Sequence, residues 1–537
     1  MRCCHVRGFF IFALFISGLQ PIIAQTTFAK RLALKHTNFV ARAVTVYGDQ
    51  YYVSGIAYGN DPYVYNGTQS LVLNRLGEIA DSILIAPSDQ RVEAWGRENL
   101  IIGDTLYFSG DVYLQGRNVL FGYFLGDSTN SRRTMYQGPV NPDTDSGFTN
   151  AFGALNYNNK IVVYGSETNP ESLVNGLNGL LLMFDQDLNH LDTIRFDNTP
   201  EFTQSVRSFN KFDQNHSIVV ITQSNRERCE PNIKYALLKL DENFTTVDRY
   251  DVPEDENWFV RSDAFVQENG GIYVQTDSLI YDNFPLGPTD CISTKLYDGR
   301  ITKFDRNLNL VWSRDFKRPN TSPFIIPDNA GIVQAQEPDQ LVAAASYWSG
   351  EGGSVLANLV KFDTLGNEIW NRTYGFYDTT ENDVIVYDVK ADPDGGYVLV
   401  GEVRVDQNAV NDSLGRLPSQ QAWIMKVDED GCLIPGCGEV VVSSDEPELQ
   451  KRETQLLLYP NPVENLLSFL LPGNGGVIRT KTIVYDSQGR IVRRLPERDL
   501  ISGVTYNIDL EALESGIYYL SVILVDGRRK TLPFIKR

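Results

Sequence analysis

Four large side chains stand at matching places in four sequence repeats and have the chemistry to bind a ligand. Arg42, Arg207 and Arg261 occupy similar positions in three repeats, and Trp95 holds the corresponding position in a fourth. Arginine pairs with anionic groups through parallel hydrogen bonds, and an indole ring offers a flat face for stacking. These residues predict a site for an anionic or sugar ligand. The alternative is that the arginines pair with neighbouring acidic loops.

Catalytic motifs are absent from the sequence: it contains no HExxH, no GxSxG and no glycine-rich phosphate loop with its lysine. Paired carboxylates could hydrolyse a glycosidic bond, but 68 acidic residues single out no pair. We therefore expect a binding or adhesion module for an unknown glycan or protein ligand, with no cofactor and no metal. A secreted enzyme that acts on polysaccharide or peptide is the alternative.

One segment alternates oxygen-bearing side chains as a calcium-binding loop does. Asp185, Asp187 and Asn189 follow this pattern, but the sixth position is His190 rather than Gly and the twelfth is Phe196 rather than Glu. Asp and Asn are also preferred turn residues, because their side chains bond to the backbone two residues on. The pattern therefore predicts a hairpin turn rather than a metal site.

Four cysteines lie beyond the N-terminal region, at Cys229, Cys291, Cys432 and Cys437. An even number in an exported protein indicates disulfides. Cys432 and Cys437 flank the turn sequence Leu-Ile-Pro-Gly, which predicts a local bridge. Cys229 and Cys291 lie in two proline-containing insertions, and we expect them to form the second pair.

The elements that carry these residues form a repeat. A polar turn followed by a strand pattern occurs seven times, at a spacing of about 55 residues that matches a propeller blade better than a solenoid. The copies end at Gly55, Gly110, Gly165, Thr222, Thr276, Ala345 and Gly401. Another strand pattern precedes each copy and a hairpin such as residues 359–375 follows it. Four strands in each of seven repeats predict an all-β protein with a seven-bladed β-propeller at residues 25–437.

The ends of the propeller are expected to meet. The last repeat lacks a clear outer strand, and residues 26–34 resemble the outer strands of other repeats. These residues would complete the seventh blade and cover an edge that is otherwise free to pair with another chain.

The N-terminus and the overall charge indicate an exported protein. Arg2 and Arg7 precede a short apolar stretch at residues 8–19, which predicts a secretory signal peptide at residues 1–24. A buried N-terminal strand is the alternative. The net charge of −20 argues against nucleic-acid binding, which needs a basic face. We expect a monomer.

A second domain follows the propeller. Residues 438–453 are charged and weakly patterned, as a linker is. Residues 454–537 contain short alternating strand patterns separated by turn residues, which predict a small immunoglobulin-like β-sandwich. Pro460 and Pro462 predict an extended entry, and Gly489 and Gly516 are expected at turns that require a positive φ.

This second domain resembles the type A C-terminal sorting domain of the type IX secretion system of Bacteroidetes. The resemblance rests on Tyr459, Pro460, Asn461, Pro462, Asp486, Gly489, Gly516, Tyr518 and Lys536, in this order. It implies that the secretion translocon is a partner, that the domain is cleaved, and that the protein is secreted or attached to surface lipopolysaccharide. The alternative is an immunoglobulin-like adhesion module. The repeats of residues 26–437 also look like those of secreted proteins of these bacteria.

An Asp-Ser or Asp-Thr pair recurs along the chain before an apolar residue or Thr, for example at Thr364 and Ser413. This pattern is similar to the O-glycosylation motif of exported Bacteroidetes proteins. The same residues are also typical of the transition from a turn to a strand, and the two interpretations stay open.

Overall fold

The structure is a computed structural model, which describes twenty segments of the chain. They are residues 27–32, 37–59, 65–85, 92–93, 99–112, 117–125, 131–140, 149–170, 176–196, 202–225, 233–252, 263–281, 296–316, 328–348, 355–376, 383–404, 420–433, 456–471, 477–524 and 528–537. Strands dominate these segments and no helix occurs in them, which confirms the all-β class.

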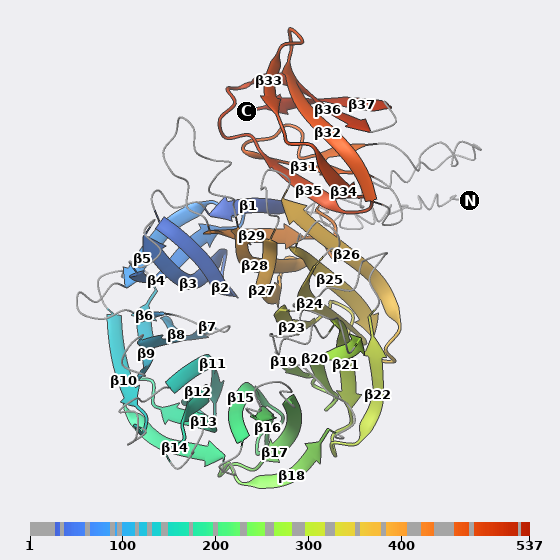
Figure 1. Ribbon diagram of the computed structural model, residues 1–537. Coiled ribbons are helices and arrows are strands. Elements are labelled where there is room, and N and C mark those ends of the chain that lie inside the picture. Colours follow the sequence, from blue (N-terminus) through green and yellow to red (C-terminus); the bar gives the residue numbers. More distant parts are fainter. Residues whose placement is uncertain are drawn as a thin grey trace, which may run out of the picture.

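The first part of the chain forms antiparallel sheets, each built from consecutive strands that run from the centre outward (Figure 1). The first sheet contains β2 (Thr37–Tyr47), β3 (Gln50–Gly59), β4 (Tyr65–Asn74) and β5 (Ile79–Ile85). The next contains β6 (Val92–Glu93), β7 (Asn99–Ile102), β8 (Thr105–Val112), β9 (Arg117–Phe124) and β10 (Ser131–Gln137). Here β6 and β7 both pair with β8, so they share the innermost place.

Three further sheets follow the same order. One contains β11 (Thr149–Tyr157), β12 (Lys160–Thr168), β13 (Leu177–Phe184) and β14 (His190–Phe196). The next contains β15 (Phe202–Lys211), β16 (Ser217–Asn225), β17 (Ile233–Leu240) and β18 (Thr246–Asp251). The third contains β19 (Asp263–Val266), β20 (Ile272–Tyr281), β21 (Leu296–Phe304) and β22 (Leu310–Asp315).

Two more sheets complete the arrangement. One contains β23 (Asp328–Gln334), β24 (Gln340–Trp348), β25 (Val355–Asp363) and β26 (Glu368–Phe376). The other contains β27 (Asp383–Ala391), β28 (Tyr397–Arg404), β29 (Gln420–Val427) and, as its outer strand, β1 (Phe28–Leu32). The hairpin predicted at residues 359–375 is formed by β25 and β26.

The innermost strands form a closed cycle. Contacts between them run from β2 through β7, β11, β15, β19, β23 and β27, and from β27 back to β2. The sheets therefore stand around a common axis like the blades of a propeller, as Figure 1 shows, and we call each sheet a blade. The predicted propeller-like arrangement of sheets around an axis is confirmed.

The strand β1 closes the ring. It pairs antiparallel with β29, with Phe28 opposite Lys426 and Leu32 opposite Ala422. A segment from the start of the chain thus supplies the outer strand of the last blade, where residues 26–34 were expected. The pairing protects the edge of β29 and ties the two ends of the repeat region together.

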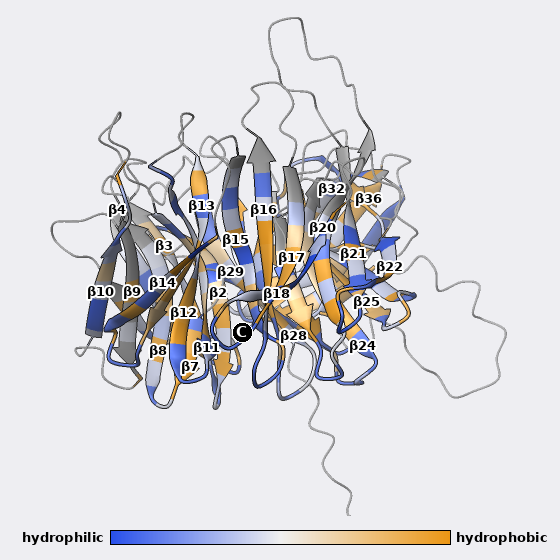
Figure 2. Cartoon of the chain, turned by 90° about the horizontal axis from the view of Figure 1, so that it is seen from below, coloured by the Kyte–Doolittle hydropathy of each residue, from blue (hydrophilic) through white to orange (hydrophobic). Residues whose placement is uncertain are grey.

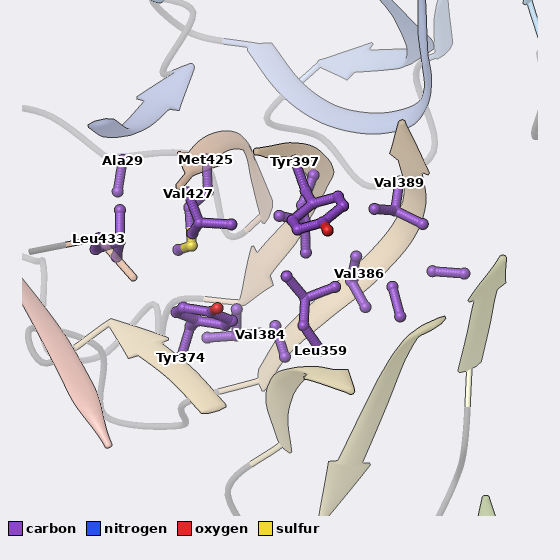
Figure 3. Close-up of a cluster of buried hydrophobic side chains, with 14 of the residues drawn as sticks. Ala29, Leu359, Tyr374, Val384, Val386, Val389, Tyr397, Met425, Val427 and Leu433 are labelled. Atoms are coloured by element: carbon purple, nitrogen blue, oxygen red, sulfur yellow. The ribbon is translucent and has the colours of Figure 1, made fainter. Parts of the chain in front are cut away.

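Apolar side chains fill the spaces between blades. Strands carry alternating polar and apolar residues, visible as blue and orange bands in Figure 2. One cluster, between the β23–β26 blade and the blade closed by β1, contains Leu359, Tyr374, Tyr397, Met425 and Leu433 (Figure 3). Both faces of a blade are buried against neighbours, which explains why the middle strands are so apolar.

The C-terminal domain has two sheets. One contains β30 (Leu457–Tyr459), β31 (Leu466–Leu470) and β35 (Thr505–Asp509). The other contains β32 (Val477–Asp486), β33 (Ile491–Arg494), β34 (Arg498–Ile501), β36 (Gly516–Leu524) and β37 (Arg529–Lys536). Phe469, Ile508, Leu520 and Phe534 share one core, so the two sheets pack face to face.

The C-terminal domain lies against the outer edge of the β23–β26 blade (Figure 1). Its strand β35 pairs in parallel with β26. The β23–β26 blade therefore continues through β35 and β31 to β30 as one sheet. Within the described segments, no helix is long and apolar enough to cross a membrane.

Candidate ligand-binding channel

A β-bulge recurs at the same place in the innermost strands. The register shifts at one residue in β2, β11, β15, β23 and β27. The bulged residues are Arg42, Phe152, Arg207, Ala330 and Tyr387. A bulge leaves one residue out of the ladder and changes the direction of its side chain. The five bulges therefore place a ring of five side chains at equivalent positions on the innermost strands.

Each arginine of this ring stacks on an aromatic residue of the same ring. The Arg42 Cζ lies 3.8 Å from the centroid of the Tyr387 ring, and the Arg207 Cζ lies 4.4 Å from that of Phe152. In both pairs the arginine belongs to the blade that adjoins the aromatic residue. Cation–π stacking holds a guanidinium in one orientation without neutralising its charge. Two guanidinium groups are thus held at equivalent places on β2 and β15.

Hydrogen bonds hold both pairs in place. The Arg207 Nε donates to the Thr222 Oγ1 at 3.3 Å, and the Tyr387 hydroxyl donates to the Glu402 Oε1 at 3.0 Å. Glu402 is buried on β28, and its backbone oxygen accepts a bond from Trp423 Nε1 at 2.9 Å. In these two blades the second strand therefore supports the bulge side chain of the first.

The residues directly after the bulges join neighbouring blades. The Asp388 Oδ2 accepts a bond from the backbone N–H of Val44 at 2.8 Å, which links the last blade to the first. In the same way, the Ser208 Oγ accepts from the Ala264 N–H at 3.2 Å and donates to the Asp263 Oδ1 at 3.0 Å. These bonds give a partner to backbone N–H groups on the innermost strand of the neighbouring blade.

Asp388 also has a perturbed acidity. Its burial raises the pKa of the carboxyl group to about 6, and the charge of Asp263 adds to the rise while Lys390 opposes it. Lys390 Nζ lies 3.0 Å from the Asp388 Oδ1. The two carboxylates are thus close enough to interact, but both accept bonds from backbone N–H groups, as structural groups do.

Glycine in the second strand makes room for the bulge. A Cβ on Gly55, Gly165 or Gly401 would lie 1.8 Å from the backbone oxygen of Val40, Asn150 or Ile385, respectively, just before each bulge. No side chain fits at that distance. In these three blades the glycine that ends the sequence repeat is therefore required by the close approach of the innermost strand.

The structure brings two of the four predicted ligand-binding residues to equivalent places. Arg42 and Arg207 are both bulge residues, whereas Trp95 and Arg261 lie outside the described residues. Phe152 and Tyr387 were not identified from the sequence. Phe152 precedes Gly165 by the same interval as Arg42 precedes Gly55, so counting back from the repeat glycine was the available signal.

The outer hairpin turns use their aspartates as turn residues. The Asp363 Oδ1 accepts backbone bonds from Leu365 at 2.9 Å and Asn367 at 2.8 Å. The same two bonds occur at Asn74, Asp185, Asp241, Asp305 and Asp428. At Asp185, bonds from the side chain and backbone of Asn189 lower the carboxyl pKa. The turn interpretation of Asp185 and Asn189 is confirmed.

No group of three or more His, Cys, Asp or Glu side chains in the described part of the chain is arranged to hold a metal ion. Cys432 is in a disulfide. Cys229, Cys291 and Cys437 lie outside the described residues, so both predicted pairings stay predictions.

The first and last segments of the C-terminal domain meet in space. The Asn461 Oδ1 accepts a bond from the Ile535 N–H at 2.9 Å, and its Nδ2 donates to the Pro533 oxygen at 3.3 Å. Val463 forms a parallel bridge with Lys536. The Tyr-Pro-Asn-Pro segment thus pairs with the outer edge of β37, the last strand.

Two expectations about this domain are wrong. Pro460 and Pro462 follow cis peptide bonds in a bend between β30 and β31, so the entry is not extended. Gly489 does have a positive φ, of 77°, at the turn that Asp486 stabilises. Gly516 has no positive φ; it begins β36, and a Cβ there would lie 3.4 Å from the ring of Tyr518.

Comparison with known proteins identifies the C-terminal domain. Residues 457–531 match the family model of the secretion system C-terminal sorting domain. These residues form a type IX secretion sorting domain. The protein is therefore secreted or carried at the cell surface, and its sorting domain interacts with the type IX secretion system.

Several solved structures are similar to this chain at low sequence identity, and no curated protein matches the sequence. Chaetomium thermophilum Raptor is 9% identical, with a TM-score of 0.40, over 75% of this chain and 30% of Raptor, so the chain spans about a third of that protein. A PL25 ulvan lyase is 9% identical (TM-score 0.45; 75% and 97% covered). The β-propeller domain of the Trilobed protease from Pyrococcus furiosus is also 9% identical (TM-score 0.37; 74% and 98% covered).

Proposed function

We propose that this protein is an exported seven-bladed β-propeller whose central channel binds an anionic glycan. The closed cycle of inner strands and the closing strand β1 support the propeller over residues 25–437. The two packed sheets of the C-terminal domain support an immunoglobulin-like sandwich over residues 454–537. A signal peptide at residues 1–24 and a linker at residues 438–453 complete the proposed organisation.

The stacked arginine–aromatic pairs carry this proposal. Arg42 on Tyr387 and Arg207 on Phe152 fix positive charge at equivalent places on the innermost strands, and Phe152 is partly exposed beside Arg207 whereas Tyr387 is buried. Acidic sugars present both a carboxylate or sulfate group and an apolar ring face, so the two kinds of surface suit one ligand. Trp95 and Arg261, from two further blades, are proposed to contribute to the same site.

Glycan binding by the full mature chain tests the proposal. We expect binding to acidic polysaccharides on a mixed array and at least a tenfold weaker affinity for the double variant Arg42→Gln/Arg207→Gln. Arg249→Gln is the matched control, because Arg249 carries the same charge on an outer strand, where it pairs with Asp251. Thermal unfolding of each variant confirms that the fold is kept. Undiminished binding by the folded double variant would refute the site.

A secreted enzyme acting on polysaccharide or peptide is the second candidate, and Asp388 is the observation that favours it. Its carboxyl group, with a pKa of about 6 and Asp263 nearby, has the acidity of a general acid near neutral pH. Release of reducing ends or peptides by the wild type, but not by Asp388→Asn, would support the enzyme. Binding without turnover supports the binding module.

The fate of the exported protein forms the last part of the proposal. We propose that the mature propeller is a monomer that is either released or attached to surface lipopolysaccharide after sorting. Sedimentation of the secreted protein tests the monomer. Attachment to lipopolysaccharide predicts that the protein is recovered in the outer-membrane fraction and that its mass is increased by variable amounts.

A further inference from the structure

A short strand pairing joins the sorting domain to the propeller. Tyr374 of β26 stands opposite Thr505 of β35, and Phe376 stands opposite Asn507. The Asn507 Nδ2 donates to the Gly375 oxygen at 3.0 Å, and the Ser468 Oγ donates to the Asn507 Oδ1 at 2.6 Å. Asn507 is fully buried, so its amide is satisfied only when the two domains are together.

The pairing has a close apolar contact beside it. A Cβ on Gly375 would lie 3.0 Å from Leu356 Cδ2 of the propeller and 3.4 Å from Cδ1 of the Tyr506 ring, so this ring lies close to the propeller backbone. Leu466 of β31 packs against the buried cluster drawn in Figure 3, which belongs to the propeller. The interface therefore combines main-chain pairing, a buried amide and shared apolar core.

Both ends of the propeller take part in this interface. The Thr27 Oγ1 donates to the Leu433 oxygen at 2.7 Å and lies 3.3 Å from the Tyr459 hydroxyl of the sorting domain. Burial lowers the pKa of Lys30 on β1. The negative charges of Glu78 and of Glu464, which belongs to the sorting domain, act in the opposite direction and raise it. The surface that receives the sorting domain is thus complete only when β1 has closed the ring.

We propose that the Tyr374–Phe376 edge of β26 is a strand-docking surface whose occupant is the Thr505–Asn507 segment of the sorting domain, and that this docking holds the two domains together without the covalent linker. Strand addition to a sheet edge is a recurring mode of recognition, in which main-chain bonds supply affinity and side chains supply specificity. Here Asn507 and Tyr506 supply the specificity.

This docking has a consequence for export that is independent of what the channel binds. Cutting the linker leaves the sorting domain seated on the propeller. Its release then requires a partner that separates β35 from β26, and the Thr505–Asn507 edge becomes available for pairing at that moment. The docked sorting domain also covers a sheet edge that would otherwise be free to pair with another chain.

The test uses the full mature chain with a specific protease site inserted at residues 438–453. After cleavage at micromolar concentration, we expect the sorting domain to co-elute with the propeller in size-exclusion chromatography and native mass spectrometry. Asn507→Ala should speed its dissociation at least tenfold, because the Gly375 oxygen and the Ser468 hydroxyl lose their partner. Hydrogen exchange of residues 374–376 should rise in parallel.

Two further variants make the outcome decisive. Ser521→Ala removes a buried hydroxyl from the other sheet of the sorting domain and should leave co-elution unchanged. Ser468→Ala removes the hydroxyl that donates to the Asn507 Oδ1 and should weaken docking even if the Asn507 variant does not fold. Immediate separation of the cleaved wild-type domains, or equal dissociation of all variants, overturns the proposal.

Discussion

Tyr51 and Asp392 join the first blade to the last one. The Tyr51 hydroxyl donates to the Asp392 Oδ2 at 2.6 Å, and the same carboxylate pairs with Lys426 at 3.1 Å and with Arg75 at 2.9 Å. Asp392 and Lys426 are almost completely buried. Burial of the Tyr51 hydroxyl and its bond to Asp392 raise the pKa of Tyr51. This buried network is therefore a second link at the site of ring closure.

Replacing Asp392 should destabilise the propeller strongly. Asp392→Ala leaves the Lys426 ammonium buried without its anion, and we expect a loss of about 3–5 kcal/mol in the free energy of unfolding. Denaturant unfolding at pH 7 measures it. Asp394→Ala is the matched control, because that side chain is 61% exposed and 3.7 Å from Arg75; its loss should stay below about 1 kcal/mol. A small effect at Asp392 would mean that Lys426 finds another partner.

Replacing Gly401, the glycine that ends the last sequence repeat, should lower the stability of the fold more than the addition of one methyl group suggests. In Gly401→Ala the new Cβ would lie 1.8 Å from the Ile385 oxygen and 2.8 Å from the Trp423 ring. The backbone of the bulge must move, so we expect a loss of about 3 kcal/mol or more. Gly299→Ala is the control, since no atom lies within 4 Å of the position that its new methyl group would take. Equal thermal shifts for the two variants would refute the role assigned to the bulge.

The repeat period and the ring closure could be predicted from sequence because they depend on local patterns. Turn residues, alternating strands and the outer-strand likeness of residues 26–34 can all be recognised without a structure. The ring of bulges is different, because nothing local marks Phe152 or Tyr387 as bulged; only their similar distance from the repeat glycine does. The β26–β35 pairing depends on how two complete domains meet, and no strand pattern encodes it.

The acidity of Asp388 predicts a pH dependence of stability. The unfolded carboxyl group has a pKa of about 3.9 and burial raises the folded value to about 6, so the folded state holds this proton more tightly. The stability that protonation provides is present below about pH 4 and is lost as the pH rises through about 6. As the pH rises from about 4 to above 6, the free energy of unfolding of the wild type should therefore fall by roughly 2–3 kcal/mol relative to that of Asp388→Asn.

Unfolding free energies of the wild type and Asp388→Asn at pH values from 4 to 7 provide the measurement. The difference between the two proteins should change across this range and level off at its upper end. Asp187→Asn is the control, because its side chain is 73% exposed, and its difference from the wild type should stay flat. A flat difference for Asp388→Asn as well would show that Lys390 keeps Asp388 ionised throughout.

The outer hairpin turns need an oxygen acceptor at their first residue, and this acceptor need not carry a negative charge. Asp363 accepts two backbone bonds through Oδ1, and Asn74 accepts the same two bonds in its own turn. Asp363→Ala removes the acceptor and should cost about 1–2 kcal/mol, whereas Asp363→Asn keeps it and should cost less than half as much. Chemical denaturation of the three proteins measures this order. If the two variants were equally destabilised, the carboxylate charge rather than the turn geometry would be what the hairpin needs.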